Sequence, residues 1–117
     1  MVKILIVDDN EDVTYSLKKS LESIDMDYNV TTAHSGKECL ELVKKDKPDI
    51  VLMDIMMPEM DGFEVADQIK DIPVLFITGK ANMIREAKSR RIDFLMKPID
   101  MKVLNDRIKQ ILKLWSE

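Results

Sequence analysis

Charged and hydroxyl side chains stand at the ends of the short apolar runs of this sequence. Asp8 and Asp9 follow the first run, Asp54 follows the third, Thr78 follows the fourth and Lys97 follows the fifth. Clustered carboxylates repel one another unless a cation neutralises them, and Mg²⁺ prefers oxygen ligands, with Mn²⁺ as an alternative ion. A carboxylate beside such an ion can attack a phosphoryl group, whose charge an ammonium and a hydroxyl would stabilise. These residue types indicate metal-assisted phosphoryl transfer to an aspartate, with Asp54 as the natural nucleophile.

The apolar runs alternate with amphipathic segments, which indicates an α/β fold. Apolar residues spaced three or four apart predict helices with one core-facing stripe within residues 13–24 and 104–115. Three shorter helices are expected at residues 36–45, 62–70 and 81–90, and strands at residues 3–7, 28–33, 50–53, 73–77 and 93–96. Three strands are continuously apolar, as in a parallel sheet covered on both faces. The expected fold is a (βα)5 doubly wound, five-stranded parallel sheet.

The predicted topology brings the five polar side chains together. In such sheets, ligands bind beyond the carboxyl ends of the strands. Taken singly, each residue has an ordinary structural explanation: Asp8 and Asp9, with Asn10, could cap a helix, Asp54 could begin a turn, Thr78 could be a strand residue and Lys97 could be solvated. Their convergence on one edge of the sheet favours the functional interpretation over these alternatives.

Composition limits the class of protein. The chain has 117 residues, 45% of them hydrophobic and 34% charged, so one domain with its own core is expected over residues 1–117. One cysteine and one histidine cannot form an intramolecular disulfide or a zinc site of the Cys/His kind, which favours a reducing, cytoplasmic setting. The apolar runs are too short to cross a bilayer, so neither a signal peptide nor a membrane partner is expected.

Charge is distributed unevenly along the chain. Residues 1–78 carry a net charge of −9 and residues 79–117 a net charge of +5, within a total of −4. A nucleic-acid-binding domain usually presents a net basic face and aromatic side chains for stacking, whereas this chain is acidic overall and only 5% aromatic. Direct binding of nucleic acid is therefore not expected.

Over essentially its whole length, the chain resembles the receiver domain of two-component response regulators. The similarity rests on ILIVDDN, AHSG, VLMDIMMPEMDG, ITG and FLMKP, at residues 4–10, 33–36, 51–62, 77–79 and 94–98. The resemblance implies a flavodoxin-like sheet with strand order 2-1-3-4-5. Asp54 would be the phospho-acceptor, Asp9 and Asp54 direct Mg²⁺ ligands, Asp8 a ligand through water, and the backbone carbonyl of Met56 a further ligand.

The resemblance also implies a switch. Thr78 would be the switch hydroxyl, Phe94 the switch aromatic and Lys97 the partner of the phosphoryl oxygens, with a cis Lys97–Pro98 peptide bond. Phe94 lacks the hydroxyl that tyrosine would bring to this position. Arg90 and Arg91 replace a common Gly-Ala pair, so the fourth helix is expected to be shortened or displaced. The third helix is also expected to be brief.

A receiver domain of this kind would act as an acceptor rather than as an enzyme, although it would assist its own phosphorylation and dephosphorylation. The implied partners are a sensor histidine kinase or phosphotransfer protein and a downstream effector, with a phosphorylation-dependent homodimer as a further candidate. The surface of the fourth helix, fifth strand and fifth helix would respond to phosphorylation. Its basic residues predict a negatively charged partner; these are Arg85, Lys88, Arg90 and Arg91.

Two other kinds of protein share part of this pattern. Haloacid-dehalogenase-like phosphatases also use an aspartyl nucleophile, but they need two aspartates separated by one residue, whereas Asn10 lies two residues after Asp8, and this chain is too short for their cap. A phosphorylation-insensitive pseudo-receiver would lack at least one of the five polar side chains, and none is missing. Whether the domain acts alone or within a longer regulator stays open.

Overall fold

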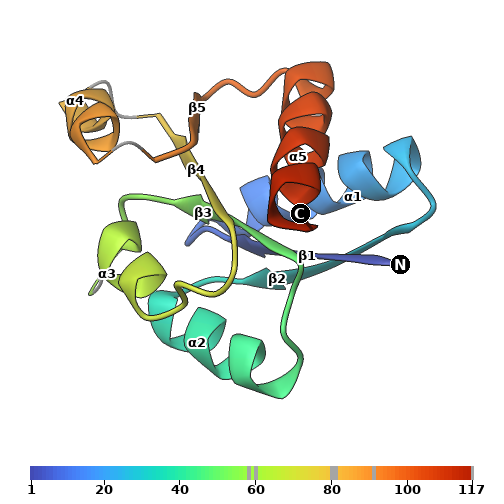
Figure 1. Ribbon diagram of the computed structural model, residues 1–117, viewed down its shortest axis with the longest axis horizontal. Helices are drawn as coiled ribbons and strands as arrows, with labels where there is room; N and C mark the ends of the chain where they lie inside the picture. The colour runs from blue at the N-terminus through green and yellow to red at the C-terminus, as the bar shows by residue number, and fades with distance from the viewer. Residues whose placement is uncertain (58, 60, 80–81, 91, 117) are drawn as a thin grey trace.

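The computed structural model describes residues 1–57, 59, 61–79, 82–90 and 92–116, which form five strands and five helices (Figure 1). All strand pairs are parallel and the strand order is β2-β1-β3-β4-β5, which confirms the predicted fold and topology. In chain order the elements are β1 (Val2–Val7), α1 (Glu11–Ile24), β2 (Tyr28–Ala33), α2 (Gly36–Lys45), β3 (Ile50–Asp54), α3 (Gly62–Asp67), β4 (Val74–Thr78), α4 (Asn82–Ser89), β5 (Phe94–Met96) and α5 (Met101–Ser116).

Helices α3 and α5 differ most from their predicted bounds. Helix α3 ends earlier than the predicted residue 70, because the N–H groups of Gln68 and Ile69 donate to carbonyls only three residues back, which tightens the chain into a turn. Helix α5 begins earlier than its apolar stripe, because the Asp100 side chain accepts hydrogen bonds from the N–H groups of Lys102 and Val103. The predicted fourth helix is observed as α4, while Ala81 lies outside the described residues.

The sheet has a separate core on each face. Along β1, Ile4 and Ile6 pack in the cluster that includes α1 and α5, whereas Leu5 and Val7 pack in the cluster that includes α2 and α3. Figure 1 shows these helix pairs on opposite sides of the sheet. The two-residue period of a strand produces this division, and it explains why β1, β3 and β4 are apolar at consecutive positions.

The register aligns the carboxyl ends of the strands. Val7 pairs with Met53, Asp54 with Ile77, and Thr78 with Met96. Side chains at or just beyond these positions therefore meet at one edge of the sheet. No described helix is both long and apolar enough to span a membrane.

Candidate functional site

Three aspartates meet at the carboxyl edge of the sheet. Asp8, Asp9 and Asp54 each offer one carboxylate oxygen, and these oxygens lie within 4.8 Å of one another. Asp8 is buried, Asp54 is half-buried and Asp9 is exposed. The cluster predicted from the strand ends is confirmed, and its hard oxygen donors match the ligand preference of Mg²⁺.

Lys97 reaches the same cluster from the loop after β5. Its ammonium nitrogen Nζ donates a hydrogen bond to Oδ2 of Asp8 at 2.9 Å and lies 3.7 Å from Oδ2 of Asp54. The backbone N–H of Lys97 donates to the carbonyl of Thr78 at 2.8 Å, which ties this loop to the end of β4. The Lys97–Pro98 peptide bond is cis, as predicted.

Asn10, rather than the neighbouring aspartates, caps helix α1. Its side-chain oxygen accepts hydrogen bonds from the N–H groups of Asp12 and Val13, at 2.9 and 3.3 Å. Its own N–H donates to Oδ1 of Asp8 at 2.9 Å. Asn and Asp are similarly good N-caps, so sequence alone did not distinguish them. Of the three residues that could have capped the helix, Asn10 is the one that does, and its N–H also orients Asp8.

The chain after Asp54 folds back closely on β3. The N–H of Met56 donates to Oδ1 of Asp54 at 3.3 Å, and the N–H of Gly62 donates to the carbonyl of Ile55 at 2.7 Å. A Cβ atom at position 62 would lie 2.7 Å from the carbonyl oxygen of Asp54 and 3.3 Å from the Phe76 ring. Glycine is thus required here by the close approach of two backbones. Pro58 and Met60 of the same motif lie outside the described residues, and the predicted metal-ligand role of the Met56 carbonyl stays a prediction.

The electrostatic environment of Asp54 favours a reactive carboxylate. Burial raises its pKa above the ordinary value; Lys97 opposes this shift, the charges of Asp8 and Asp9 add to it, and the Met56 N–H opposes it. The raised pKa means that the charged form is less stable here than in water, which makes the carboxylate a stronger base and nucleophile.

Lys97 is held in its charged form. Burial alone would lower its pKa, but the hydrogen bond to Asp8 and the negative charge of Asp54 outweigh burial, so the pKa of Lys97 is raised. A permanent cation therefore lies against the two less exposed carboxylates. It offsets part of their repulsion without any bound ion.

The two predicted switch residues lie on the neighbouring strands β4 and β5. Thr78 is fully buried at the end of β4, and Phe94 at the start of β5 is half-buried and packs against the core cluster on the α2 and α3 side. Phe94 pairs with Phe76 in the sheet. Their roles as switch residues, and their movement on phosphorylation, stay predictions.

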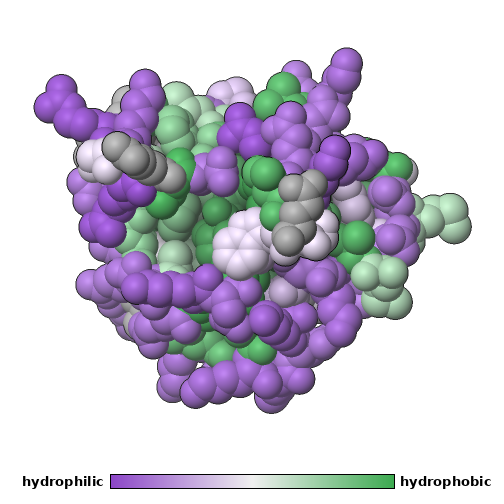
Figure 2. Space-filling view, viewed as in Figure 1, coloured by the Kyte–Doolittle hydropathy of each residue, from purple (hydrophilic) through white to green (hydrophobic). Residues whose placement is uncertain are grey.

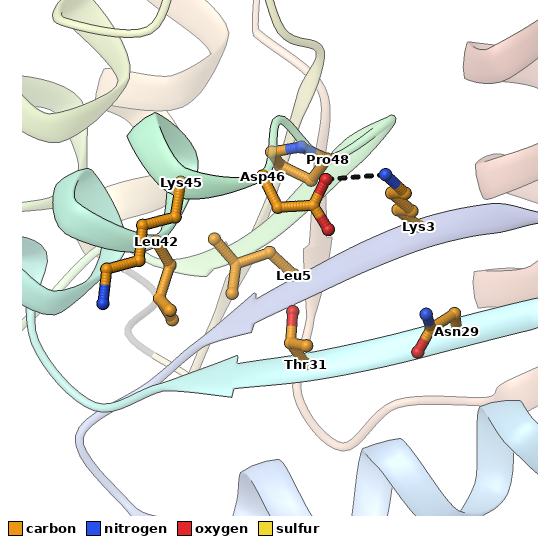
Figure 3. Close-up of a pocket in the computed structure, with 8 residues that line it drawn as sticks. All are labelled: Lys3, Leu5, Asn29, Thr31, Leu42, Lys45, Asp46 and Pro48. Atoms are coloured by element: carbon orange, nitrogen blue, oxygen red, sulfur yellow. Dashed lines mark hydrogen bonds and ion pairs between the residues drawn. The ribbon is translucent and has the colours of Figure 1, made fainter.

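A separate small hollow lies near the amino ends of β1 and β2, beside the carboxyl end of α2 (Figure 3). An ion pair between Lys3 Nζ and Asp46 Oδ1, 2.6 Å apart, lies at its rim. Leu5 and Leu42 contribute apolar surface. Because Lys3 lies at the end of β1 opposite to Asp8, this hollow takes no part in the aspartate cluster.

Comparison with known proteins agrees with this geometry. Residues 4–109 match the family described as response regulator receiver domain. The chain is 36% identical to the response regulator MprA of Mycobacterium ulcerans and 34% identical to the alkaline phosphatase synthesis transcriptional regulatory protein PhoP of Bacillus subtilis. These alignments cover 96% and 95% of this chain but 50% and 48% of the relatives, so the chain spans about half their length.

A solved structure of similar size shows the same fold. The CheY-like response regulator receiver domain protein of Methanospirillum hungatei superimposes with a TM-score of 0.86 at 27% sequence identity, covering 99% of this chain and 97% of that one. The family match extends over nearly all of the chain and includes the aspartate cluster, Thr78 and Lys97. The chain therefore belongs to the response regulator receiver domains of two-component systems.

Proposed function

We propose that this domain accepts a phosphoryl group on Asp54 from the phosphohistidine of a sensor kinase or phosphotransfer protein, with Mg²⁺ as cofactor. The observation that carries the proposal is the cluster of three carboxylates with oxygens within 4.8 Å, contacted by the Lys97 ammonium. Bringing three carboxylates this close together is unfavourable in free energy unless a cation binds among them. Its placement at the carboxyl edge of the sheet leaves Asp9 exposed to an incoming ligand.

In the proposed transfer, a carboxylate oxygen of Asp54 forms a bond to phosphorus as the P–N bond to the donor imidazole breaks. The imidazole nitrogen keeps the electron pair and takes up a proton from solvent. Met56 donates its N–H to Oδ1 of Asp54, and Lys97 lies on the Oδ2 side, so both oxygens are oriented before the donor arrives. Preorganised donors of this kind stabilise charge that develops on transferred oxygens.

The donor set fits a hard divalent cation, because all three clustered groups are carboxylates. Asp9 and Asp54 would hold the ion directly and Asp8 through water, with the Met56 carbonyl as a further ligand. When bound, Mg²⁺ would neutralise charge on the phosphoryl oxygens. Lys97 would then exchange its hydrogen bond with Asp8 for one with the phosphoryl group.

The phosphorylated domain would signal through α4, β5 and α5. Thr78 would turn its hydroxyl toward the phosphoryl oxygens, and Phe94 would turn inward. The charge added at Asp54 would in this way change the conformation of the surface formed by α4, β5 and α5. In this scheme the domain is an acceptor that assists its own phosphorylation and dephosphorylation, and an effector protein or domain reads the change. A phosphorylation-dependent homodimer is an alternative use of the same surface.

Intact-mass measurement after incubation with acetyl phosphate and Mg²⁺ tests the proposal. One added phosphoryl group is expected, and its addition should require both the metal and Asp54. Asp61→Asn is a matched control, because Asp61 caps α3 through Glu64 N–H and asparagine is an equally good cap. Phosphorylation of Asp54→Asn at the wild-type rate would contradict the assignment, and no phosphorylation of the wild-type domain would favour a pseudo-receiver.

A further inference from the structure

Arg90, the residue after α4, links this helix to α3. Its guanidinium carbon Cζ lies 4.4 Å from the centroid of the Phe63 ring, and its Nε donates to Oε1 of Glu86 at 2.8 Å. The hydrogen bond to Glu86 and the charges of Asp67 and Asp61 raise the pKa of Arg90. Arg90 is therefore a bridging side chain rather than an isolated surface charge.

Few apolar contacts hold α4 in place. Among residues 83–89, Ala87 is the one fully buried side chain, and Met83 and Ile84 are half-buried. On the face shown in Figure 2, hydrophilic side chains cover the region of α4, and apolar side chains gather between it and α5. Because α4 buries so little apolar surface, its local stability is low. The Arg90–Phe63 contact therefore supplies a larger share of the interactions that hold α4 in position than it would for a well-packed helix.

Phe63 is in turn connected to the acceptor strand. It is 5% exposed, and its ring centroid lies 5.2 Å from that of Phe76 on β4. The preceding residue, Gly62, is hydrogen-bonded to the Ile55 carbonyl and has no room for a Cβ beside the Asp54 carbonyl oxygen. A shift of backbone at Asp54 must therefore move the start of α3, and with it the ring that Arg90 contacts.

We propose that the Arg90–Phe63 contact restrains α4 against α3 in the unphosphorylated domain and is weakened when Asp54 is phosphorylated. This inference rests on the proposed acceptor function. It adds a route from the acceptor to α4 that passes through α3 and is separate from Thr78 and Phe94. By linkage, a contact that favours the unphosphorylated arrangement lowers affinity for a phosphoryl group, so its removal should raise that affinity.

Beryllofluoride, a phosphoryl mimic, tests the inference with Arg90→Ala and a control, Arg85→Ala, which removes an exposed arginine from the same helix. For Arg90→Ala, amide hydrogen exchange in residues 83–89 should be about three- to tenfold faster without ligand. Its affinity for beryllofluoride with Mg²⁺, measured by calorimetry, should be about two- to fivefold higher. Arg85→Ala should match the wild-type domain in both measurements.

Arg90→Lys separates stacking from charge, because lysine keeps the charge but lacks the planar guanidinium. It should behave more like Arg90→Ala, and wild-type behaviour would overturn the role of stacking on Phe63. Faster exchange with unchanged affinity would overturn the link to Asp54. A wild-type domain that binds no beryllofluoride would contradict the acceptor proposal and this inference together, whereas normal binding with identical Arg90→Ala and Arg85→Ala variants would contradict this inference alone.

Discussion

The ammonium of Lys97 is hydrogen-bonded to Asp8, at 2.9 Å, and lies farther from Asp54, at 3.7 Å. The Asp8 side chain is 6% exposed, so its charge has little contact with water. Lys97 therefore compensates the charge of the most buried carboxylate in the aspartate cluster. Binding of a cation and a phosphoryl group would have to replace this pair.

Lys97→Met should destabilise the metal-free domain, because methionine keeps much of the side-chain length but leaves the carboxylate of Asp8 without its cation. Breaking a buried pair is strongly destabilising, and the partial exposure of Lys97 reduces the expected loss to about 1–3 kcal/mol. Urea denaturation with and without Mg²⁺ measures it, and the ion should reduce the loss. Lys3→Met, which removes a more exposed lysine paired with Asp46, should have little effect. Equal losses for the two variants would contradict the interpretation.

Asp54→Asn should stabilise the metal-free domain at neutral pH. The raised pKa of Asp54 means that the folded state binds its proton more tightly than the unfolded state, so charging this carboxyl costs stability as the pH rises through the folded pKa. Below the ordinary value of 3.8 both states are protonated and the cost disappears. Thermal melting should show a gain of a few degrees near pH 7 that shrinks toward about pH 4. A gain independent of pH would exclude charge as its origin.

Mg²⁺ should stabilise the unphosphorylated domain, because the three carboxylates are brought together only in the folded state. At an ion concentration about tenfold above the dissociation constant, the gain in the free energy of unfolding should be about 1.4 kcal/mol. Asp9→Ala should remove most of it, whereas Asp12→Ala, at an exposed carboxylate outside the cluster, should retain it. A melting temperature indifferent to Mg²⁺ would count against the site.

Gly62→Ala should be destabilising by about 1–3 kcal/mol, because its Cβ would meet backbone atoms of Asp54 and Ile55 at 2.7 and 3.1 Å. It should also slow phosphorylation, since relief of the clash displaces the acceptor strand. Gly79→Ala is the matched control: its Cβ would make ordinary contacts, at 3.7 and 3.8 Å, with the Lys97 side chain. Denaturant midpoints that fall equally for both variants would show that the loss of glycine, rather than the clash, is responsible.

Much of the site could be predicted from the sequence because it depends on topology. Runs of four to six mostly apolar residues mark the strands, and parallel strands must end at the same edge, so Asp8, Asp54 and Lys97 had to converge. Which carboxylate Lys97 contacts could not be predicted, since all three aspartates are equivalent at that level. The close packing of Gly62 against Asp54 could not be predicted either, because it depends on how the intervening loop returns to β3.

The structural role of Arg90 could not be predicted from the distribution of charges along the sequence. The sequence suggested a free basic surface that included Arg90 and Arg91, but Arg90 contacts Phe63 and Glu86, and Arg91 lies outside the described residues. The two residues of the stack are 27 positions apart, and no periodicity connects them. Reversing the charge of Arg90 would therefore disturb α4 itself, so a test of the partner's charge needs other residues.

Arg85 and Lys88 are exposed on α4, and their replacement by glutamate tests whether the effector is acidic. Exposed interface charges mainly change the association rate, so the double variant should associate with the effector several-fold more slowly at low salt, with a smaller difference at high salt. Phosphorylation of Asp54 by acetyl phosphate should be unaffected. Stopped-flow association of the phosphorylated domains at two salt concentrations measures the effect.

The charges of Arg85 and Lys88 also affect whether the proposed homodimer can form. A two-fold interface through α4 would place Arg85 and Lys88 of one copy near those of the other, and like charges oppose such pairing at low salt. Light scattering of the phosphorylated domain should therefore show a monomer at low salt. A dimer that forms in the wild-type domain but not in the glutamate variant would instead favour self-association through this surface. Unchanged association kinetics in the glutamate variant, or amide shifts on phosphorylation that spare α4, β5 and α5, would contradict an acidic effector binding to this surface.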